Sequence, residues 1–182
     1  VFVVVIVLIG FYLVYLRDDV LVLQEEPQLQ SPLVIMKPFD IKNFTLPVNG
    51  KAITLVNNGA ITASLTSPTT TTRYFGNVAT GDLNADDYTD IALLVTQKVE
   101  GFPTVKYYTV VVLIIDGGYI PLNAMYIGDD IAPQSTIITD GKLEVNYLIK
   151  KTIATSTAQV KAIRRYEVSV DKKLVESISQ PQ

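Results

Sequence analysis

The 182-residue sequence contains no histidine and no cysteine. These two absences exclude Ser-His-Asp and Cys-His nucleophilic centres, zinc sites built on thiolate or imidazole ligands, and disulfides. A bound metal ion must therefore be held by oxygen ligands, which suits calcium or magnesium. The net charge of −3 gives no general basis for binding nucleic acid, so no nucleic-acid partner is expected.

The first 16 residues, VFVVVIVLIGFYLVYL, contain no charged side chain, and the run ends at Arg17. As a helix this segment would cover about 24 Å, slightly less than the roughly 30 Å hydrocarbon core of a bilayer. No small-x-small cleavage site follows it, so an uncleaved transmembrane helix over residues 1–19 is favoured over a signal peptide. We therefore expect contact with the membrane through residues 1–16.

The flank that follows this predicted anchor is acidic, because residues 17–30 carry one positive and four negative charges. Positive charge is normally retained on the cytoplasmic side of a membrane. We therefore predict a single-pass protein of a bacterial cytoplasmic membrane whose C-terminal domain lies on the extracytoplasmic side. A proline-containing tether is expected over residues 20–42, followed by one domain over residues 43–182.

The predicted domain consists of short runs rich in β-branched and aromatic residues, and no part of it shows a helical period over twelve residues. A short helix over residues 158–166 is an alternative for one segment. Turn signals separate the runs, at Asn57-Asn58-Gly59, Asp116-Gly117-Gly118, Asp140-Gly141 and Asp171-Lys172. The pattern predicts a mainly β fold of about ten strands, arranged as a meander or a β-sandwich.

The stretch GDLNADDYTDIALLV, residues 81–95, combines a cluster of acidic side chains with an aliphatic run. A calcium loop places oxygen ligands at alternate positions, in the pattern D-x-[DN]-x-[DN]-G-x-x-D with a backbone carbonyl at position seven. This sequence matches the pattern at positions one, three, five, seven and nine, and the candidate ligands are therefore Asp82, Asn84, Asp86, the carbonyl of Tyr88, and Asp90.

Two positions depart from a tight calcium loop. Position six is Asp87 where glycine normally makes a left-handed turn, a conformation that aspartate tolerates better than most residues. Position twelve is Leu93, so the bidentate glutamate of an EF-hand is absent. Two interpretations stay open for this loop: a structural Ca²⁺ site, or a hydrogen-bonded turn rich in Asp and Asn that needs no ion.

A wider resemblance covers residues 44–150. The segments TTRYFGNVATGDLNADDYTDIALLVTQ, YYTVVVLI and LNAMYIGDDIAPQSTIITDGKLEVNY follow one another in this order. They resemble a family of uncharacterised bacterial membrane-anchored extracytoplasmic proteins with a GDLNGDGxxDAALLL-type loop, and the loop itself is similar to the calcium loops of FG-GAP-type repeats. The resemblance implies an extracytoplasmic β-domain; no enzymatic activity is established for that family, so the resemblance bears on location and fold more than on function. Asp87 replaces the loop glycine of that pattern, and Asp130 replaces an arginine.

The chain is therefore expected to be a non-enzymatic, membrane-anchored structural or interaction subunit of a cell-envelope assembly, with protein partners and a structural Ca²⁺. One alternative is a ligand- or glycan-binding surface module that uses the acidic loop and nearby tyrosines. Another is a pilin-like filament subunit. Pilins typically carry a glutamate at the fifth position, and the presence of Val5 there argues against this alternative. A metal hydrolase with oxygen ligands is a third.

Two other groups of residues are interpreted structurally. The acidic pair Asp129-Asp130 is expected in an exposed turn and not as an acid and base for hydrolysis. Tyr107, Tyr108 and Tyr147 are expected in the core or on a sheet face, and not as a platform for sugars. No catalytic residue is predicted.

Overall fold

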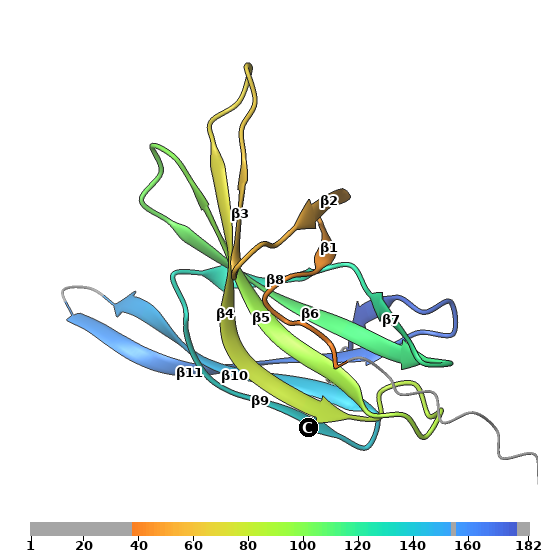
Figure 1. Ribbon diagram of the computed structural model, residues 1–182. Coiled ribbons are helices and arrows are strands. Elements are labelled where there is room, and N and C mark those ends of the chain that lie inside the picture. The colour runs from red at the N-terminus through yellow and green to blue at the C-terminus, as the bar shows by residue number, and fades with distance from the viewer. Residues whose placement is uncertain (1–37, 154–155, 178–182) are drawn as a thin grey trace, which may run out of the picture. The chain divides into compact units, whose positions relative to one another are not determined.

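The computed structural model describes residues 38–153 and 156–177, and within these ranges the chain forms twelve β-strands and no helix (Figure 1). The prediction of a mainly β domain is confirmed. The predicted transmembrane helix over residues 1–19 and most of the predicted tether lie outside the described residues. In the part of the chain that is described, no helix has the length and apolar character needed to cross a membrane.

Three antiparallel sheets make up the described fold. The central sheet has the order β3-β4-β5-β6-β7, and β8 also pairs with β6. Its strands are β3 (Gly59–Thr62), β4 (Thr70–Gly81), β5 (Asp90–Val99), β6 (Val105–Ile115), β7 (Gly118–Pro121) and β8 (Met125–Asp129). The second sheet has the order β12-β11-β10-β9, from β9 (Ala132–Thr139), β10 (Lys142–Ile153), β11 (Ser156–Val168) and β12 (Leu174–Glu176). The third is a hairpin of β1 (Thr45–Val48) and β2 (Lys51–Thr54).

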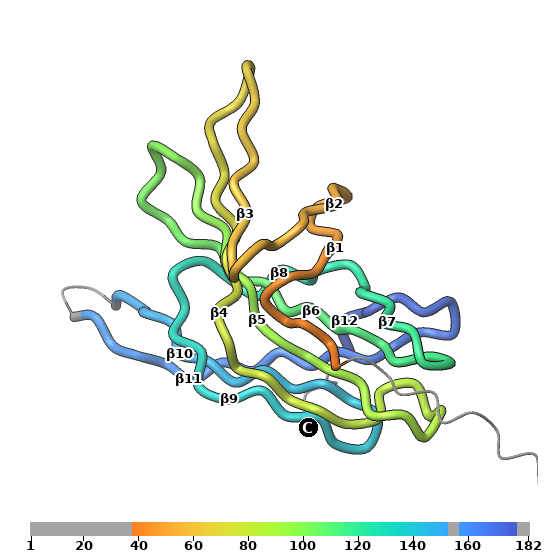
Figure 2. Tube along the Cα trace, viewed as in Figure 1, coloured from red at the N-terminus to blue at the C-terminus, as the bar shows by residue number. Residues whose placement is uncertain are grey.

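The middle parts of β5 and β6, residues 92–95 and 108–113, are buried on both faces, which explains why these stretches are almost continuously apolar. Successive side chains of a strand point to opposite faces. One face packs against the β9–β12 sheet in a core that includes Leu94, Leu113, Leu143 and Tyr166. The other face packs against the β1–β2 hairpin in a second core that includes Leu46, Leu55, Leu93 and Val110. The result is three layers with the central sheet in the middle (Figure 2).

Four tight turns have both central residues in the left-handed region, as type I′ turns require. Their residue pairs are Asn49–Gly50 (φ 51° and 74°), Asn57–Asn58 (52° and 74°), Asp116–Gly117 (48° and 78°) and Asp140–Gly141 (51° and 69°). The predicted hairpin at Asp140–Gly141 is confirmed, because it joins β9 to β10 with Thr139 opposite Lys142. The predicted turn after Asp116 is also confirmed, and it joins β6 to β7.

The predicted hairpin around Asn57-Asn58-Gly59 is only half right. The turn forms, and Val56 and Gly59 exchange backbone hydrogen bonds of 2.8 and 3.2 Å. The flanking strands then separate, since β2 pairs with β1 and β3 pairs with β4. The physical reason is burial: Ile53 in β2 is drawn into the second core, whereas Ile61 in β3 is 75% exposed at the sheet edge.

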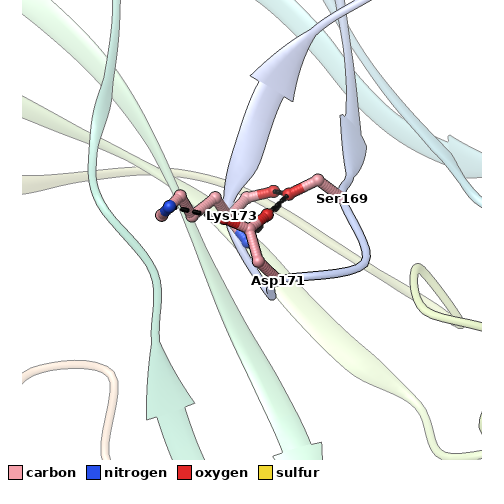
Figure 3. A network of polar contacts seen from close by, with 3 residues as sticks. All are labelled: Ser169, Asp171 and Lys173. Carbon is pink, nitrogen blue, oxygen red and sulfur yellow. Dashed lines mark hydrogen bonds and ion pairs between the residues drawn. The ribbon is translucent and has the colours of Figure 1, made fainter.

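The connection between β11 and β12 confirms the predicted C-terminal hairpin, although the turn is longer than two residues. Val168 and Leu174 are paired, and residues 169–173 form the connection. Figure 3 shows how a polar network holds it: the Ser169 hydroxyl donates to Asp171, and Lys173 forms an ion pair with the same carboxylate. The alternative of a helix over residues 158–166 is wrong, because this segment lies within strand β11.

Candidate functional site: an acidic loop between β4 and β5

The acidic loop, residues 82–89, connects the end of β4 to the start of β5. One of its side chains, Leu83, points into the first core and is 3% exposed. Gly81, the residue just before the loop, lies so close to β9 that a Cβ atom placed on it would be 2.6 Å from Ile138 Cγ2. An apolar anchor and a close interlayer contact therefore fix where the loop begins.

Asp82, at position one, organises the backbone of the loop. Its Oδ1 accepts hydrogen bonds from the backbone N–H groups of Asn84, Ala85 and Asp86 at 3.1, 2.8 and 3.4 Å, and its Oδ2 accepts one from Asp87 at 3.1 Å. Desolvation alone would raise the pKa of this carboxyl, but the four backbone donors outweigh it and hold the pKa below its usual value. The ionised form of Asp82 is therefore the one that the loop stabilises.

Asn84 and Asp86, at positions three and five, lie side by side. The Asn84 amide nitrogen donates to Asp86 Oδ2 at 2.8 Å, and Asp86 Oδ1 accepts from the backbone N–H of Tyr88 at 2.9 Å. The Asn84 carbonyl oxygen, Oδ1, is buried and accepts no hydrogen bond from any described residue. Because buried polar atoms are nearly always satisfied, this oxygen is one that an additional donor or cation would complete.

Asp90, at position nine, is fully buried beneath the loop and not on its surface. Its Oδ2 accepts from Leu83 N and its Oδ1 from Ile114 N, both at 2.9 Å. Burial raises the pKa of Asp90 above its usual value against the opposing effect of these two donors, and the negative charges of Asp86 and Asp82 raise it further. Asp90 therefore connects the loop to strand β6.

The backbone at position six has the conformation that a calcium loop requires. Asp87 is left-handed with φ 65°, as the match to the loop pattern predicted for this position. Ala85, at position four, is also left-handed with φ 59°. An alanine gains nothing from this conformation, which costs an L-residue roughly 1–2 kcal/mol. The hydrogen bonds to Asp82 offset that cost.

A cleft of about 490 Å³ opens beside the loop. Asn84 and Asp86 line one side, and the β11–β12 connection lines another with Ser169, Val170 and Lys172. Sequence reasoning did not connect this turn with the acidic loop, since more than 80 residues separate Asn84 from Ser169. The acidic loop and the β11–β12 connection are brought together by the packing of the β9–β12 sheet against the central sheet.

The five predicted ligands are only partly brought together. Asp82, Asn84 and Asp86 are in mutual contact through the hydrogen bonds above, whereas Asp90 lies beneath them with both oxygens engaged. The Tyr88 side chain is 46% exposed, whereas the predicted ligand at this position is its backbone carbonyl, which stays a prediction. Among the described residues, no group of three or more acidic side chains converges in a metal-binding geometry. The hydrogen-bonded turn that the sequence allows is therefore present in the structure.

The same residues still fit an oxygen-preferring cation. A carboxylate has about four acceptor sites, and Asp86 uses two of them in the hydrogen bonds described. The buried Asn84 Oδ1 uses none. Asp86, Asn84 and the second oxygen of Asp82 are therefore the groups that would hold a Ca²⁺, which prefers carboxylate and carbonyl oxygens in an irregular shell.

The other predicted residues are structural. Asp129 pairs with Lys106 at 3.5 Å, and Asp130 Oδ1 accepts from Val105 N at 2.9 Å, so the acidic pair fastens the β8–β9 turn to β6. Tyr108 and Tyr147 are 3% and 7% exposed, which confirms their assignment to the core. Tyr107 packs against Phe75 with ring centroids 5.3 Å apart.

Comparison with known proteins yields no relative: no protein-family model, curated protein or solved structure matches this chain.

Proposed function

We propose that this protein is a non-enzymatic β-domain, anchored in a bacterial cytoplasmic membrane and located on its extracytoplasmic side. In this proposal it serves as a structural or interaction subunit of a cell-envelope assembly, and the acidic loop holds a structural Ca²⁺. The uncharged segment over residues 1–16 and the acidic flank after it support the location. The resemblance of residues 44–150 to membrane-anchored extracytoplasmic proteins supports it as well.

The observation that carries the ion proposal is the unpartnered side-chain oxygen of Asn84. Its carbonyl oxygen is buried without a partner among the described residues, while its amide nitrogen donates to the carboxylate of Asp86, which still has acceptor sites. The left-handed Asp87 and the capping role of Asp82 also support the proposal, because a calcium loop uses both features. A bound cation would satisfy Asn84 and reduce the repulsion among three nearby carboxylates.

Thermal unfolding of the full chain with calcium or with a chelator tests the ion. An ion that binds only the folded state stabilises it by about 2.7 kcal/mol at a hundred times its dissociation constant. We expect calcium to raise the midpoint, and Asp86→Ala to abolish the rise. Glu100→Gln is the matched control, because it removes an exposed carboxylate just after the end of β5 that lies opposite the loop, and it should leave the response unchanged.

A midpoint that does not move at several millimolar calcium would reject the ion. The loop would then be held by its own hydrogen bonds alone, with Asp82 as the cap. The rest of the proposal would stand, because membrane location and assembly do not depend on the ion.

The interaction role is supported by apolar side chains at one end of the central sheet. The β3–β4 and β5–β6 connections project from that end (Figure 1), and their bases are joined by a 2.8 Å backbone bond from Glu100 N to Thr69 O. Ile61 in β3, Leu65 in the first connection and Phe102 in the second are 75%, 106% and 59% exposed. Large apolar side chains exposed on projecting connections are candidates for contact with a partner.

The assembly can be tested by solubilising the intact protein from its native membrane and measuring its size by native electrophoresis. We expect a complex larger than the monomer, and we expect the double variant Leu65→Glu/Phe102→Glu to release the monomer. Exposed Lys142, in β10, provides the control position, since Lys142→Glu should leave the complex intact. A wild-type protein that is strictly monomeric would contradict the interaction role.

A further inference from the structure

A groove that several polar side chains line lies on the central sheet where the β1–β2 hairpin ends. Along β5 the side chains that face the hairpin are Leu93, Val95 and then Gln97, so the face changes from apolar to polar beyond the second core. Thr72 and Lys106 stand opposite Gln97 on the two neighbouring strands. The groove consists of two clefts of about 510 and 250 Å³, which share Asn49, Thr70 and Gln97 in their linings.

Gln97 is the buried polar group at the centre of the groove. Its side chain is only 8% exposed, and its amide nitrogen donates to Thr72 Oγ1 at 3.2 Å. Its carbonyl oxygen accepts no hydrogen bond from a described residue, although both clefts are lined by this residue. A neutral amide held rigidly in a half-satisfied state is suited to receive a donor from a ligand.

Asn49 contributes a second amide from the hairpin side. It occupies the left-handed first position of the Asn49–Gly50 turn, and its amide nitrogen donates to the Tyr108 hydroxyl oxygen at 3.2 Å. This bond orients the side chain and leaves its carbonyl oxygen without a donor among the described residues. Thr70, which lines both clefts, adds a hydroxyl group.

Tyr126 provides an aromatic surface at one end of the groove. It is 42% exposed, and its ring makes an edge contact with Tyr108 at a centroid distance of 5.7 Å. The Lys106 ammonium lies over one face of the ring, 5.5 Å from the ring centroid, and is paired with Asp129 at 3.5 Å, so a ligand would pack on the opposite face. The ring is thus fixed in place, and the charge beside it is balanced.

We propose that this groove binds a neutral oligosaccharide. A pyranose ring presents hydroxyl groups that can donate to the amide oxygens of Asn49 and Gln97, and an apolar C–H face that can pack on Tyr126. The two clefts share three lining residues, and together they give room for several linked sugar units. The groove is separate from the acidic loop, so the proposal does not depend on whether that loop holds an ion.

The test measures binding of three probes, maltohexaose, cellohexaose and chitohexaose, by saturation-transfer NMR and calorimetry. The full chain is kept in a zwitterionic detergent, because a detergent with a sugar headgroup would compete. At least one probe should bind, and Tyr126→Ala should weaken it about tenfold, which is the loss of one stacking contact. Tyr126→Phe should bind within about threefold of the wild type.

Two further variants keep the result interpretable. Asn49→Gly removes the amide from a left-handed position that glycine adopts without strain, so it should weaken binding without disturbing the turn. Tyr88→Ala removes a tyrosine that is 46% exposed on the acidic loop, and it should bind like the wild type.

Failure of all three probes to bind overturns the proposal. So does an equal loss of affinity in Tyr126→Ala and Tyr88→Ala. Tighter binding of a hexamer of uronic acid than of any neutral probe would overturn the neutral ligand class. Binding should be the same with calcium and with a chelator, which separates this outcome from the outcome for the acidic loop.

Discussion

The hydroxyl of Tyr166 is buried at the centre of the first core and accepts or donates no hydrogen bond among the described residues. A buried polar group without a partner costs about 1–3 kcal/mol. Tyr166→Phe removes only this oxygen, so we expect the free energy of unfolding to rise by about 1 kcal/mol in urea or thermal unfolding. Tyr108→Phe should instead lower it, because that hydroxyl is bonded to Asn49. A clear loss of stability in Tyr166→Phe would show that its hydroxyl has a partner.

Buried and partly buried tyrosines also determine how the stability of the domain changes at alkaline pH. Burial, a hydrogen bond to Asp129 and the charge of that residue raise the pKa of Tyr126 to about 12. Burial also raises the pKa of Tyr166. In the unfolded chain these phenols titrate near 10. Above that pH the unfolded state has lost protons that the folded state retains, so stability falls as the pH rises from about 10 to 12.

Absorbance of the phenolate, recorded with unfolding midpoints across this range, checks the prediction. We expect the wild-type midpoint to fall steeply with pH and the Tyr126→Phe variant to fall less steeply, because one of the raised groups is gone. A midpoint that is flat up to about pH 12 would contradict the assignment.

At the level of elements, the junction of β4 with β9 depends on one glycine. A Cβ atom at Gly81 would lie 2.6 and 2.9 Å from Ile138 Cγ2 and Cβ, which is closer than carbon atoms approach. Gly81→Ala should therefore separate the two strands and cost about 1–3 kcal/mol in unfolding free energy. Gly59→Ala is the matched control, since its nearest neighbour would be the Thr72 carbonyl oxygen at an ordinary 3.6 Å. Equal stability of the two variants would contradict the close contact.

The turns show how much of these elements could be predicted from sequence. Asp140–Gly141 predicts a hairpin because an Asp-Gly pair adopts two left-handed conformations at little cost. Asn49–Gly50 carries the same signal, but the strands on its two sides have only four residues each, so their alternating pattern is weak. The pairing of β2 with β1 could not be predicted from the Asn57–Asn58 turn, because the partner of a strand depends on which core buries it.

The acidic loop shows the same division between local and distant information. Contacts among Asp82, Asn84 and Asp86 follow from their spacing, and the sequence predicted them as neighbours. The position of Asp90 does not follow, because one of its donors is Ile114, 24 residues away on the next strand. The spacing of residues predicts contacts within the loop. The burial of Asp90 depends on the neighbouring strand of the sheet, which the spacing does not reveal.

For the described domain as a whole, the central sheet couples the two cores. Leu93 and Leu94 are consecutive in β5 and fully buried, yet Leu93 contacts the core beneath the β1–β2 hairpin and Leu94 the core beneath the β9–β12 sheet. Loss of either core exposes the same strand. We therefore expect Leu93→Ala and Leu94→Ala each to cost about 2–5 kcal/mol and each to lower a single cooperative transition.

Circular dichroism and tyrosine fluorescence, followed through the same denaturant series, distinguish this outcome from independent layers. Tyr166 and Tyr147 belong to the first core and Tyr108 to the second, so fluorescence samples both. Coincident transitions in both variants are expected. If Leu93→Ala instead unfolded the β1–β2 hairpin in a separate early step and left the main transition in place, the prediction would be wrong. The two larger sheets would then fold as a unit that does not need the hairpin.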